Sequence, residues 1–147
     1  MLNQQLVYLV QTETTAGFLS QNSQALASSK QRNKTQAFIM CVDSLSTLKE
    51  FTRVPKKFKN RLRRSKQTTF IYPNGKALRV VKDEKHLKFL KKLEWAYSSS
   101  ANLTCKSFKE SYAKQKADII VEDSRGFFES TPSNMIKINS KKERKLR

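Results

Sequence analysis

Short apolar runs of strand length alternate along this chain with amphipathic helical segments, and this alternation limits the folds that it can adopt. Residues 5–11, with Leu-Val-Tyr-Leu-Val at their centre, and residues 37–42 are rich in β-branched and aromatic side chains. Runs of this kind are typical of buried strands. Strands that alternate with helices predict an α/β domain, in which a twisted mixed sheet is flanked by helices.

Turn and cap signals divide the rest of the chain into elements. Pro73-Asn74-Gly75 is a turn signal that joins two strand-like runs into a hairpin. Asp43 or Ser44 is suited to cap a helix, and a further helix is expected to start at Asp83. The remaining predicted strands are 68–72, 77–81, 96–99, 118–121, which we expect to be buried, and 135–138. The predicted helices are 22–29, 45–51, 53–66, 83–95 and 106–116.

A length of 147 residues suits one domain with one modest core. We assign residues 1–139 to this domain and expect residues 140–147 to form a disordered basic tail. The N-terminal residues lack the positive segment and the small-residue cleavage site of a signal peptide. Because no apolar stretch approaches the roughly 20 residues that span a bilayer, we expect a cytoplasmic protein without a membrane partner.

The charge balance is strongly positive: 30 Lys and Arg against 12 Asp and Glu give a formal net charge of +18. A field of this sign attracts nucleic acid or phosphate ligands. The densest basic stretch is 53–66, where Phe58 and Leu62 predict an amphipathic helix that contains no acidic residue. This stretch is either a solvated face or an RNA contact. The candidate RNA-binding residues are Lys56, Lys57, Lys59, Arg61, Arg63 and Arg64.

Cysteine and histidine are too scarce for several kinds of chemistry. Only Cys41 and Cys105 are present, one in an apolar run and one in a polar loop, so neither a disulfide framework nor a thiolate metal site is supported. The single histidine, His86, lies among lysines, and we expect it to face solvent. Catalytic triads and zinc chemistry are therefore disfavoured.

Small polar segments follow or adjoin the predicted strands at residues 12–17, 98–104 and 131–135, and Lys30-Gln31-Arg32 follows the first helix. Hydroxyl and amide groups can hydrogen-bond an oxygen-rich ligand, while Lys and Arg two residues apart can bind separate phosphate or carboxylate oxygens. Ligands of open α/β sheets collect beyond the carboxyl ends of strands. Together these segments predict an anion pocket, although each alone reads equally well as a connecting loop. The chain has neither a P-loop nor a GxGxxG motif.

The order of these segments resembles the YrdC/YciO family, whose best-known members are threonylcarbamoyl-AMP synthases. Residues 11–17 match the family's P-T-[DE]-T-x-x-G-like segment, and residues 30–33 match its K-x-R-P. Residues 99–105 match T-S-A-N-L-S-G, and residues 132–134 match a closing P-S-T or P-S-E. The resemblance spans nearly the full length of the chain.

The chain departs from the family pattern at several positions. A family Pro is replaced by Gln11 and by Asn33, an aromatic residue by Ala16, and a Gly by Cys105. A C-terminal Arg-Gly element of the synthases has no clear equivalent after residue 139. The candidates to replace its arginine are Arg144 and Arg147.

The resemblance implies a YrdC-like domain with a wide, basic concave face. It implies an L-threonylcarbamoyladenylate synthase, a nucleotidyltransferase that acts in tRNA threonylcarbamoyladenosine modification. Such an enzyme uses threonine, bicarbonate and ATP, usually with Mg²⁺, and works with partner enzymes of tRNA threonylcarbamoyl transfer. Two alternatives remain: a non-catalytic relative that binds double-stranded RNA or tRNA, and an unrelated basic protein whose motifs are ordinary loops.

The family also implies roles for individual residues. The ligand-binding candidates are Thr12, Lys30, Arg32, Ser100, Asn102 and Ser133, with Thr69 and Arg79 as secondary candidates. Lys30 and Arg32 would hold phosphates or the threonine carboxylate, Thr12 would contact threonine, and Ser100 and Asn102 would bind nucleotide and carbamate oxygens. The serine at 133 would close the pocket. No acid–base catalyst is implied, because positioning and charge neutralisation account for most of such transfers.

Overall fold

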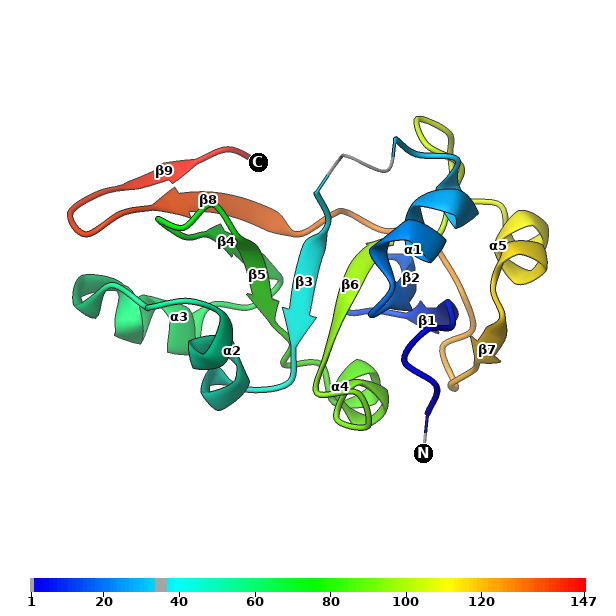
Figure 1. Ribbon diagram of the computed structural model, residues 1–147, viewed down its shortest axis with the longest axis horizontal. Helices are drawn as coiled ribbons and strands as arrows, with labels where there is room; N and C mark the ends of the chain where they lie inside the picture. Colours follow the sequence, from blue (N-terminus) through cyan, green and yellow to red (C-terminus); the bar gives the residue numbers. More distant parts are fainter. Residues whose placement is uncertain (1, 34–36) are drawn as a thin grey trace.

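A nine-stranded mixed sheet forms the centre of the computed structural model, which describes residues 2–33 and 37–147 (Figure 1). The strand order is β7-β1-β2-β6-β3-β5-β4-β8-β9. Pairing is parallel between β1 and β7, β3 and β5, and β4 and β8, and antiparallel elsewhere, so the predicted mixed sheet is confirmed. The strands are β1 (Tyr8–Gln11), β2 (Ala16–Ser20), β3 (Ile39–Val42), β4 (Thr68–Ile71), β5 (Ala77–Val80), β6 (Trp95–Ser100), β7 (Ile119–Val121), β8 (Asn134–Ile138) and β9 (Glu143–Lys145).

Helices flank the sheet, and side-chain caps fix where three of them begin. The Ser44 side chain accepts a hydrogen bond from the backbone N–H of Thr47, which makes Ser44 the cap of the two residues considered. Asp83 accepts one from the backbone N–H of His86, so the helix start expected at Asp83 is confirmed. None of the helices among the described residues is both long and apolar enough to cross a membrane. The helices are α1 (Ser23–Lys30), α2 (Leu45–Phe51), the 3₁₀ turn η1 (Lys56–Phe58), α3 (Lys59–Arg64), α4 (Glu84–Leu90) and α5 (Glu110–Lys116).

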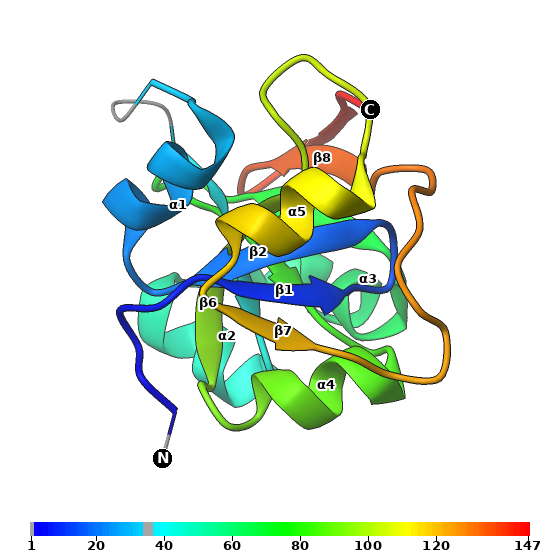
Figure 2. The ribbon, with the colours of Figure 1, turned by 90° about the vertical axis from the view of Figure 1, so that its right-hand side faces the viewer.

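Strand β1 is buried on both faces, because different helices cover the two sides of this half of the sheet. Leu9 packs in a cluster that includes Leu26 of α1 and Ala113 of α5. Its neighbour Tyr8 packs in a separate cluster with Phe89 of α4. Alternate residues of the strand therefore point to opposite helical layers, as the two-residue period of a strand requires. Figure 2 shows β1 between α5 and α4.

The other half of the sheet, from β3 to β8, packs against α2 and α3. Leu48 of α2, with Phe58 and Leu62, contacts a cluster to which β4 contributes Phe70 and β5 contributes Leu78. The burial of Phe58 and Leu62 confirms the amphipathic pattern predicted for 53–66. In Figure 1 both helices lie on the same side of this half.

Several expectations about individual segments were wrong. Residues 12–17 were expected to form a loop before the first helix, but the segment Ala16–Ser20 forms β2, which pairs antiparallel with both β1 and β6. The strand at 118–121 was expected to be buried; β7 is instead the last strand at one side of the sheet, with Ile119 and Ile120 each 41% exposed. The basic tail is not disordered, because residues 143–145 form β9 against β8.

His86 was expected to face solvent and is instead completely buried in α4. The lysines around it in the sequence point outward, while the imidazole takes the inward position of the helix. Its burial follows from helical periodicity, because it lies three residues before the buried Phe89.

Candidate functional site

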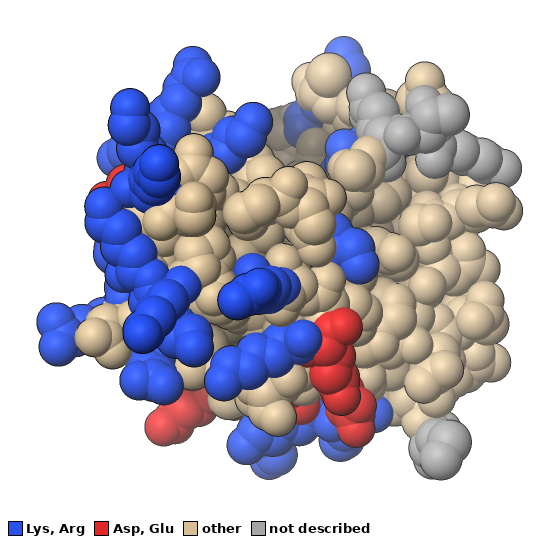
Figure 3. All heavy atoms as spheres, turned by 60° about the vertical axis from the view of Figure 1, so that its left-hand side comes forward, with Lys and Arg blue, Asp and Glu red and all other residues tan. Residues whose placement is uncertain are grey.

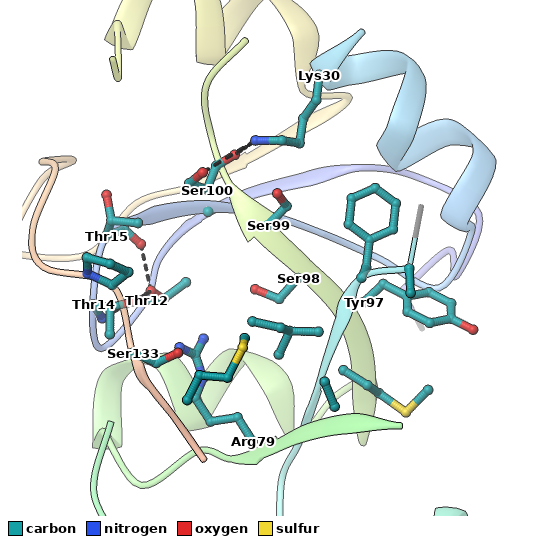
Figure 4. A pocket seen from close by; sticks show the side chains of 18 of the residues that line it. Thr12, Thr14, Thr15, Lys30, Arg79, Tyr97, Ser98, Ser99, Ser100 and Ser133 are labelled. Atoms are coloured by element: carbon teal, nitrogen blue, oxygen red, sulfur yellow. Dashed lines mark hydrogen bonds between the residues drawn. The ribbon is translucent and has the colours of Figure 1, made fainter. Parts of the chain in front are cut away.

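A cavity of about 940 Å³ lies between the end of α1 and the segment that enters β8 (Figure 4). This volume is within the range of small-molecule sites. Its walls come from the 12–15 turn, residues 30–32, strand β6 with the following 100–105 loop, and residues 132–133. The antiparallel pairing of β6 with β2 explains why segments far apart in sequence meet, because it places the end of β6 beside the start of β2, with Ser100 opposite Gly17.

The cavity gathers most of the residues singled out in the sequence. Thr69 does not line it but is fully buried behind its wall, where its hydroxyl and that of Ser133 lie 2.9 Å apart in a hydrogen bond. The predicted residues that line the cavity are Thr12, Lys30, Arg32, Arg79, Ser100, Asn102 and Ser133.

Lys30 is directed into the site by the end of α1. The next residue, Gln31, has left-handed backbone angles (φ 51°, ψ 40°), and the backbone N–H of Arg32 turns back to the carbonyl of Ala27 at 2.9 Å. This is a common way to end a helix, although the left-handed residue is usually Gly or Asn. The reversal leaves Lys30 in the last helical turn and Arg32 just beyond it, both facing the cavity.

The Lys30 ammonium group holds the loop after β6. It donates to the carbonyl oxygens of Ser100 (2.6 Å) and Asn102 (3.1 Å), and lies 3.3 and 3.2 Å from their side-chain oxygens. Burial, with a smaller contribution from Arg32, lowers the pKa of Lys30 to about 8. The group therefore remains mostly protonated at neutral pH, so it can both order the loop and attract an anion.

The 12–15 turn presents hydroxyl groups. Thr12 donates from its hydroxyl to the carbonyl of Thr15 at 2.6 Å, and the hydroxyls of Thr12 and Thr14 lie 3.2 Å apart (Figure 4). Gly17 lets this turn approach β6 closely: a Cβ atom at Gly17 would lie 2.9 Å from the methyl carbon of Thr12 and 3.2 Å from the carbonyl oxygen of Ser99. The family glycine is thus matched at a position where the packing excludes a side chain.

Arg79 lies at the bottom of the cavity and is paired with a residue that the sequence pattern did not identify. The Glu13 carboxylate lies 3.5 Å from its Nε, and each side chain is only 5% exposed. Arg79 also donates to the sulfur of the buried Cys41 at 3.4 Å. Burial raises the pKa of Glu13, although Arg79 partly offsets this effect. The signal that could have found Glu13 is its place in the segment 11–17 itself.

Arg147 supplies a further cation beside Ser133. Its guanidinium donates to the carbonyl of Ser133 at 2.9 Å and to the hydroxyl at 3.2 Å. Burial and the nearby Arg79 both lower the pKa of Arg147. Of the two arginines considered as replacements for the family's C-terminal arginine, Arg147 lines the cavity.

The charged residues of the described lining all carry the same sign, and aromatic rings lie among the uncharged ones. All five charged residues among the described lining residues are Lys or Arg, and none is Asp or Glu. The described residues also contain no cluster of three or more His, Cys, Asp or Glu that could hold a metal ion. Phe51 and Tyr97 pack edge-on against Trp95, which lies between them. The cavity is therefore suited to an anionic organic ligand with a flat or apolar part.

The departures from the family pattern have structural counterparts. Cys105 replaces a glycine at a left-handed position, with φ 65°, where a side chain is strained. Gln11 replaces a proline, and its side-chain oxygen accepts a hydrogen bond from the backbone N–H of Phe128 at 3.0 Å. The side chain of Gln11 thus ties the end of β1 to the 127–128 segment.

The six candidate RNA-binding residues are all exposed on η1 and α3. They do not line the large cavity. Two of them contact the C-terminal hairpin: Lys57 donates to the carbonyl of Lys141 at 2.7 Å, and Arg61 lies 3.6 Å from the carboxylate of Glu143. Figure 3 shows Lys and Arg side chains spread over this side of the molecule. They form one cationic surface with the hairpin.

No protein-family model and no curated protein sequence matches the chain. Solved structures do match. P. abyssi Sua5 complexed with L-threonine is similar with a TM-score of 0.82 at 17% identity, over 97% of this chain and 50% of Sua5. E. coli YciO is similar with a TM-score of 0.77 at 16% identity, over 97% of this chain and 82% of YciO.

Full-length HypF in its phosphate- and nucleotide-bound form is similar with a TM-score of 0.73 at 14% identity, over 97% of this chain and 26% of HypF. The chain therefore spans about half the length of Sua5 and a quarter of HypF. At these identities the similarities show a shared fold.

Proposed function

We propose that this chain, which has the YrdC-like fold, is an L-threonylcarbamoyladenylate synthase that converts threonine, bicarbonate and ATP into threonylcarbamoyl-AMP and pyrophosphate. The observation that carries the proposal is that segments around Thr12, Lys30, Asn102 and Ser133 converge on one cavity lined by cations. Proteins of the same fold have been solved with L-threonine and with phosphate and nucleotide, which supports this class of ligand.

Four of the five cations that line the cavity fall into two groups. Lys30 and Arg32 lie at the end of α1, whereas Arg79 and Arg147 lie beside Ser133. Two groups of cations suit a pair of ligands with well-separated anionic parts, such as a triphosphate and an amino-acid carboxylate. This arrangement favours a two-substrate site over a site for a single small anion.

In the proposed reaction, the unprotonated amine of threonine attacks the carbon of bicarbonate, and a carbamate forms with the loss of one water molecule. A carbamate oxygen then attacks the α-phosphorus of ATP, and the bond from that phosphorus to the oxygen of pyrophosphate breaks. The side chains of Thr12 and Asn102 would orient threonine and the carbamate, while Lys30 and Arg32 neutralise the charge that develops on the phosphates. None of these steps requires a protein acid or base.

Magnesium does not fit a resident protein site here. Mg²⁺ is usually held by one or two carboxylates together with substrate phosphates. Because no Asp or Glu is among the described lining residues, we assign the ion to the ATP substrate and not to the protein.

The test is pyrophosphate release from ATP and Mg²⁺ by the purified protein with bicarbonate, with and without threonine. We expect threonine-dependent release, and we expect Lys30→Met to lower it by about 100-fold or more, because one preorganised donor is typically worth this much. Lys88→Met, on the exposed side of α4, is the matched control and should leave release unchanged. A folded wild-type protein that shows no threonine-dependent release would overturn the proposal.

RNA binding without turnover is the second candidate function. The observation that favours it is the row of exposed cations on α3, which has no acidic residue within it. Binding to double-stranded RNA or tRNA through phosphates should weaken steeply as salt is added, whereas ATP binding in the large cavity should respond much less.

A further inference from the structure

A second cavity, of about 470 Å³, lies between the end of α2 and the beginning of α3. Four of the six residues that line it are basic: Lys49, Arg53, Lys56 and Lys59. Only two of these four, Lys56 and Lys59, are among the six RNA-binding candidates named from the sequence. The cavity therefore joins cations from α2, from the connection after it, from η1 and from the start of α3.

The basic residues of this region divide into two sets with different partners. Lys57 and Arg61 are engaged by the C-terminal hairpin, through the contacts to Lys141 and Glu143 described above. The four side chains around the second cavity make no hydrogen bond or ion pair with any described residue. One ion pair, between Arg61 and Glu143, therefore offsets part of the charge on the hairpin side, whereas no described carboxylate pairs with the cations around the cavity.

The backbone that carries these four cations is fixed by buried side chains and a backbone hydrogen bond. Thr52 and Val54, the other two lining residues, are only 8% and 9% exposed, and the backbone N–H of Thr52 donates to the carbonyl of Leu48 at 3.2 Å. Pro55 then restricts the backbone before η1. The cations consequently surround a hollow whose base is already formed.

Four positive charges around one hollow repel one another, and an anion placed among them would remove that repulsion. No Asp or Glu is among the described lining residues, and the nearby Glu50 forms no ion pair with a described residue. The lining also contains no aromatic ring on which a base could stack. A ligand would therefore be recognised by its anionic groups alone, as the phosphates of a nucleic-acid backbone are.

We propose that the second cavity is a binding site for consecutive backbone phosphates of RNA, with Lys49, Arg53, Lys56 and Lys59 as its ligands. Arg63 and Arg64 extend the exposed basic row along α3, as a phosphate chain that continues past the cavity would require. This proposal rests on the RNA-binding candidate function above and gives it a defined site. It does not depend on turnover in the large cavity.

The experiment compares two variants that lose the same charge. In the first, Lys49→Gln, Arg53→Gln, Lys56→Gln and Lys59→Gln are combined. In the second, four exposed lysines on α4, the turn after it and α5 are changed: Lys88→Gln, Lys91→Gln, Lys92→Gln and Lys116→Gln. The affinity of each protein for tRNA and for a duplex RNA of about 16 base pairs is measured between about 50 and 200 mM KCl.

We expect the cavity variant to bind both RNAs at least about tenfold more weakly than wild type, with a salt slope that is smaller by about one for each phosphate that the protein no longer neutralises. The control variant should change much less. Equal reductions in affinity in the two variants would mean that affinity follows net charge alone, and would overturn the cavity site while leaving RNA binding intact. Wild-type protein without measurable RNA affinity would overturn both.

Competition with inorganic pyrophosphate tests whether the second cavity binds the phosphates of an RNA backbone or those of a small molecule. If the site takes an RNA backbone, pyrophosphate should compete with RNA only weakly, because it reaches few of the cations at once. Pyrophosphate that binds wild type tightly, fails to bind the cavity variant and displaces no RNA would overturn the proposal in favour of a small-molecule site. Pyrophosphate release from ATP by the cavity variant should equal that of wild type.

Discussion

His86 lies fully buried in α4, and neither ring nitrogen has a hydrogen-bond partner among the described residues. Burial, together with the positive charges of Arg79 and Arg125, lowers the pKa of the imidazole from 6.5 to about 3, while Asp123 acts in the opposite direction. The ring is therefore neutral at pH 7 in the folded protein. In the unfolded chain it takes up a proton near its ordinary pKa.

This difference makes stability depend on pH. Because the pKa is lower in the folded state, His86 contributes stability above pH 6.5 that is lost as the pH falls from 6.5 towards 3. We expect the free energy of unfolding of wild type to fall faster than that of His86→Leu in this window, by up to about 1.4 kcal/mol per pH unit. Urea titrations at several pH values measure both.

The pKa of Glu13 also differs between the folded and unfolded states, but this difference does not affect the comparison. Its pKa is raised in the folded state, so its contribution has the opposite sign, being present at low pH and lost as the pH rises. Because both wild type and His86→Leu contain Glu13, its contribution cancels in the difference between their free energies of unfolding. Parallel pH profiles for wild type and His86→Leu would show that the imidazole is not held neutral.

The packing of strand β2 against the 12–15 turn requires a glycine at position 17. An alanine there would bring its Cβ to 2.9 Å from the Thr12 methyl carbon, so either the strand or the 12–15 turn must shift. We expect Gly17→Ala to lower the free energy of unfolding by about 1–3 kcal/mol, the usual cost of overpacking. Chemical denaturation measures this change.

The cause can be isolated because Thr12→Ser removes that methyl group and keeps the hydroxyl. Gly17→Ala should therefore cost less in the Thr12→Ser background than in wild type. If the free energy of unfolding falls equally in both backgrounds, Thr12 is not responsible, and the carbonyl of Ser99 at 3.2 Å becomes the cause.

The elements that sequence patterns predicted well are those fixed by local chemistry. The Pro73-Asn74-Gly75 turn and the Ser44 and Asp83 caps lie where short-range rules place them. Strand β2 was missed because Gly17 suggested a break, whereas the strand exists through its pairing with β1 and β6. The exposure of β7 was missed for a similar reason: an apolar run does not reveal which strand ends the sheet.

The large cavity was predictable to the extent that its residues lie in recognisable segments. Lys30, Asn102 and Ser133 each belong to such a segment, and they line one cavity. The contribution of Arg147 required knowledge of how the last strand folds back, because that residue meets Ser133 only through β8 and β9. A contact between residues that are brought together only by strand pairing cannot be predicted from local sequence patterns.

The net charge of +18 affects the stability of the whole molecule. Like charges repel most in the compact state, and salt screens them. We expect the melting temperature to rise between about 50 and 200 mM KCl, measured by circular dichroism. The melting temperature of the quadruple Lys→Gln variant at positions 88, 91, 92 and 116 should rise less with salt, because this variant has fewer charges to screen. A melting temperature that falls with salt would indicate that ion pairs outweigh repulsion.

The place of Arg147 has a practical consequence for protein production. Its backbone exchanges hydrogen bonds with Met135, and its side chain reaches Ser133. An affinity tag fused directly after it would begin beside Ser133 in the wall of the large cavity, close to where a ligand would bind. Tags for ligand-binding work on this protein should be attached to the N-terminal end, and a tag at the other end needs to be cleaved before an assay is interpreted.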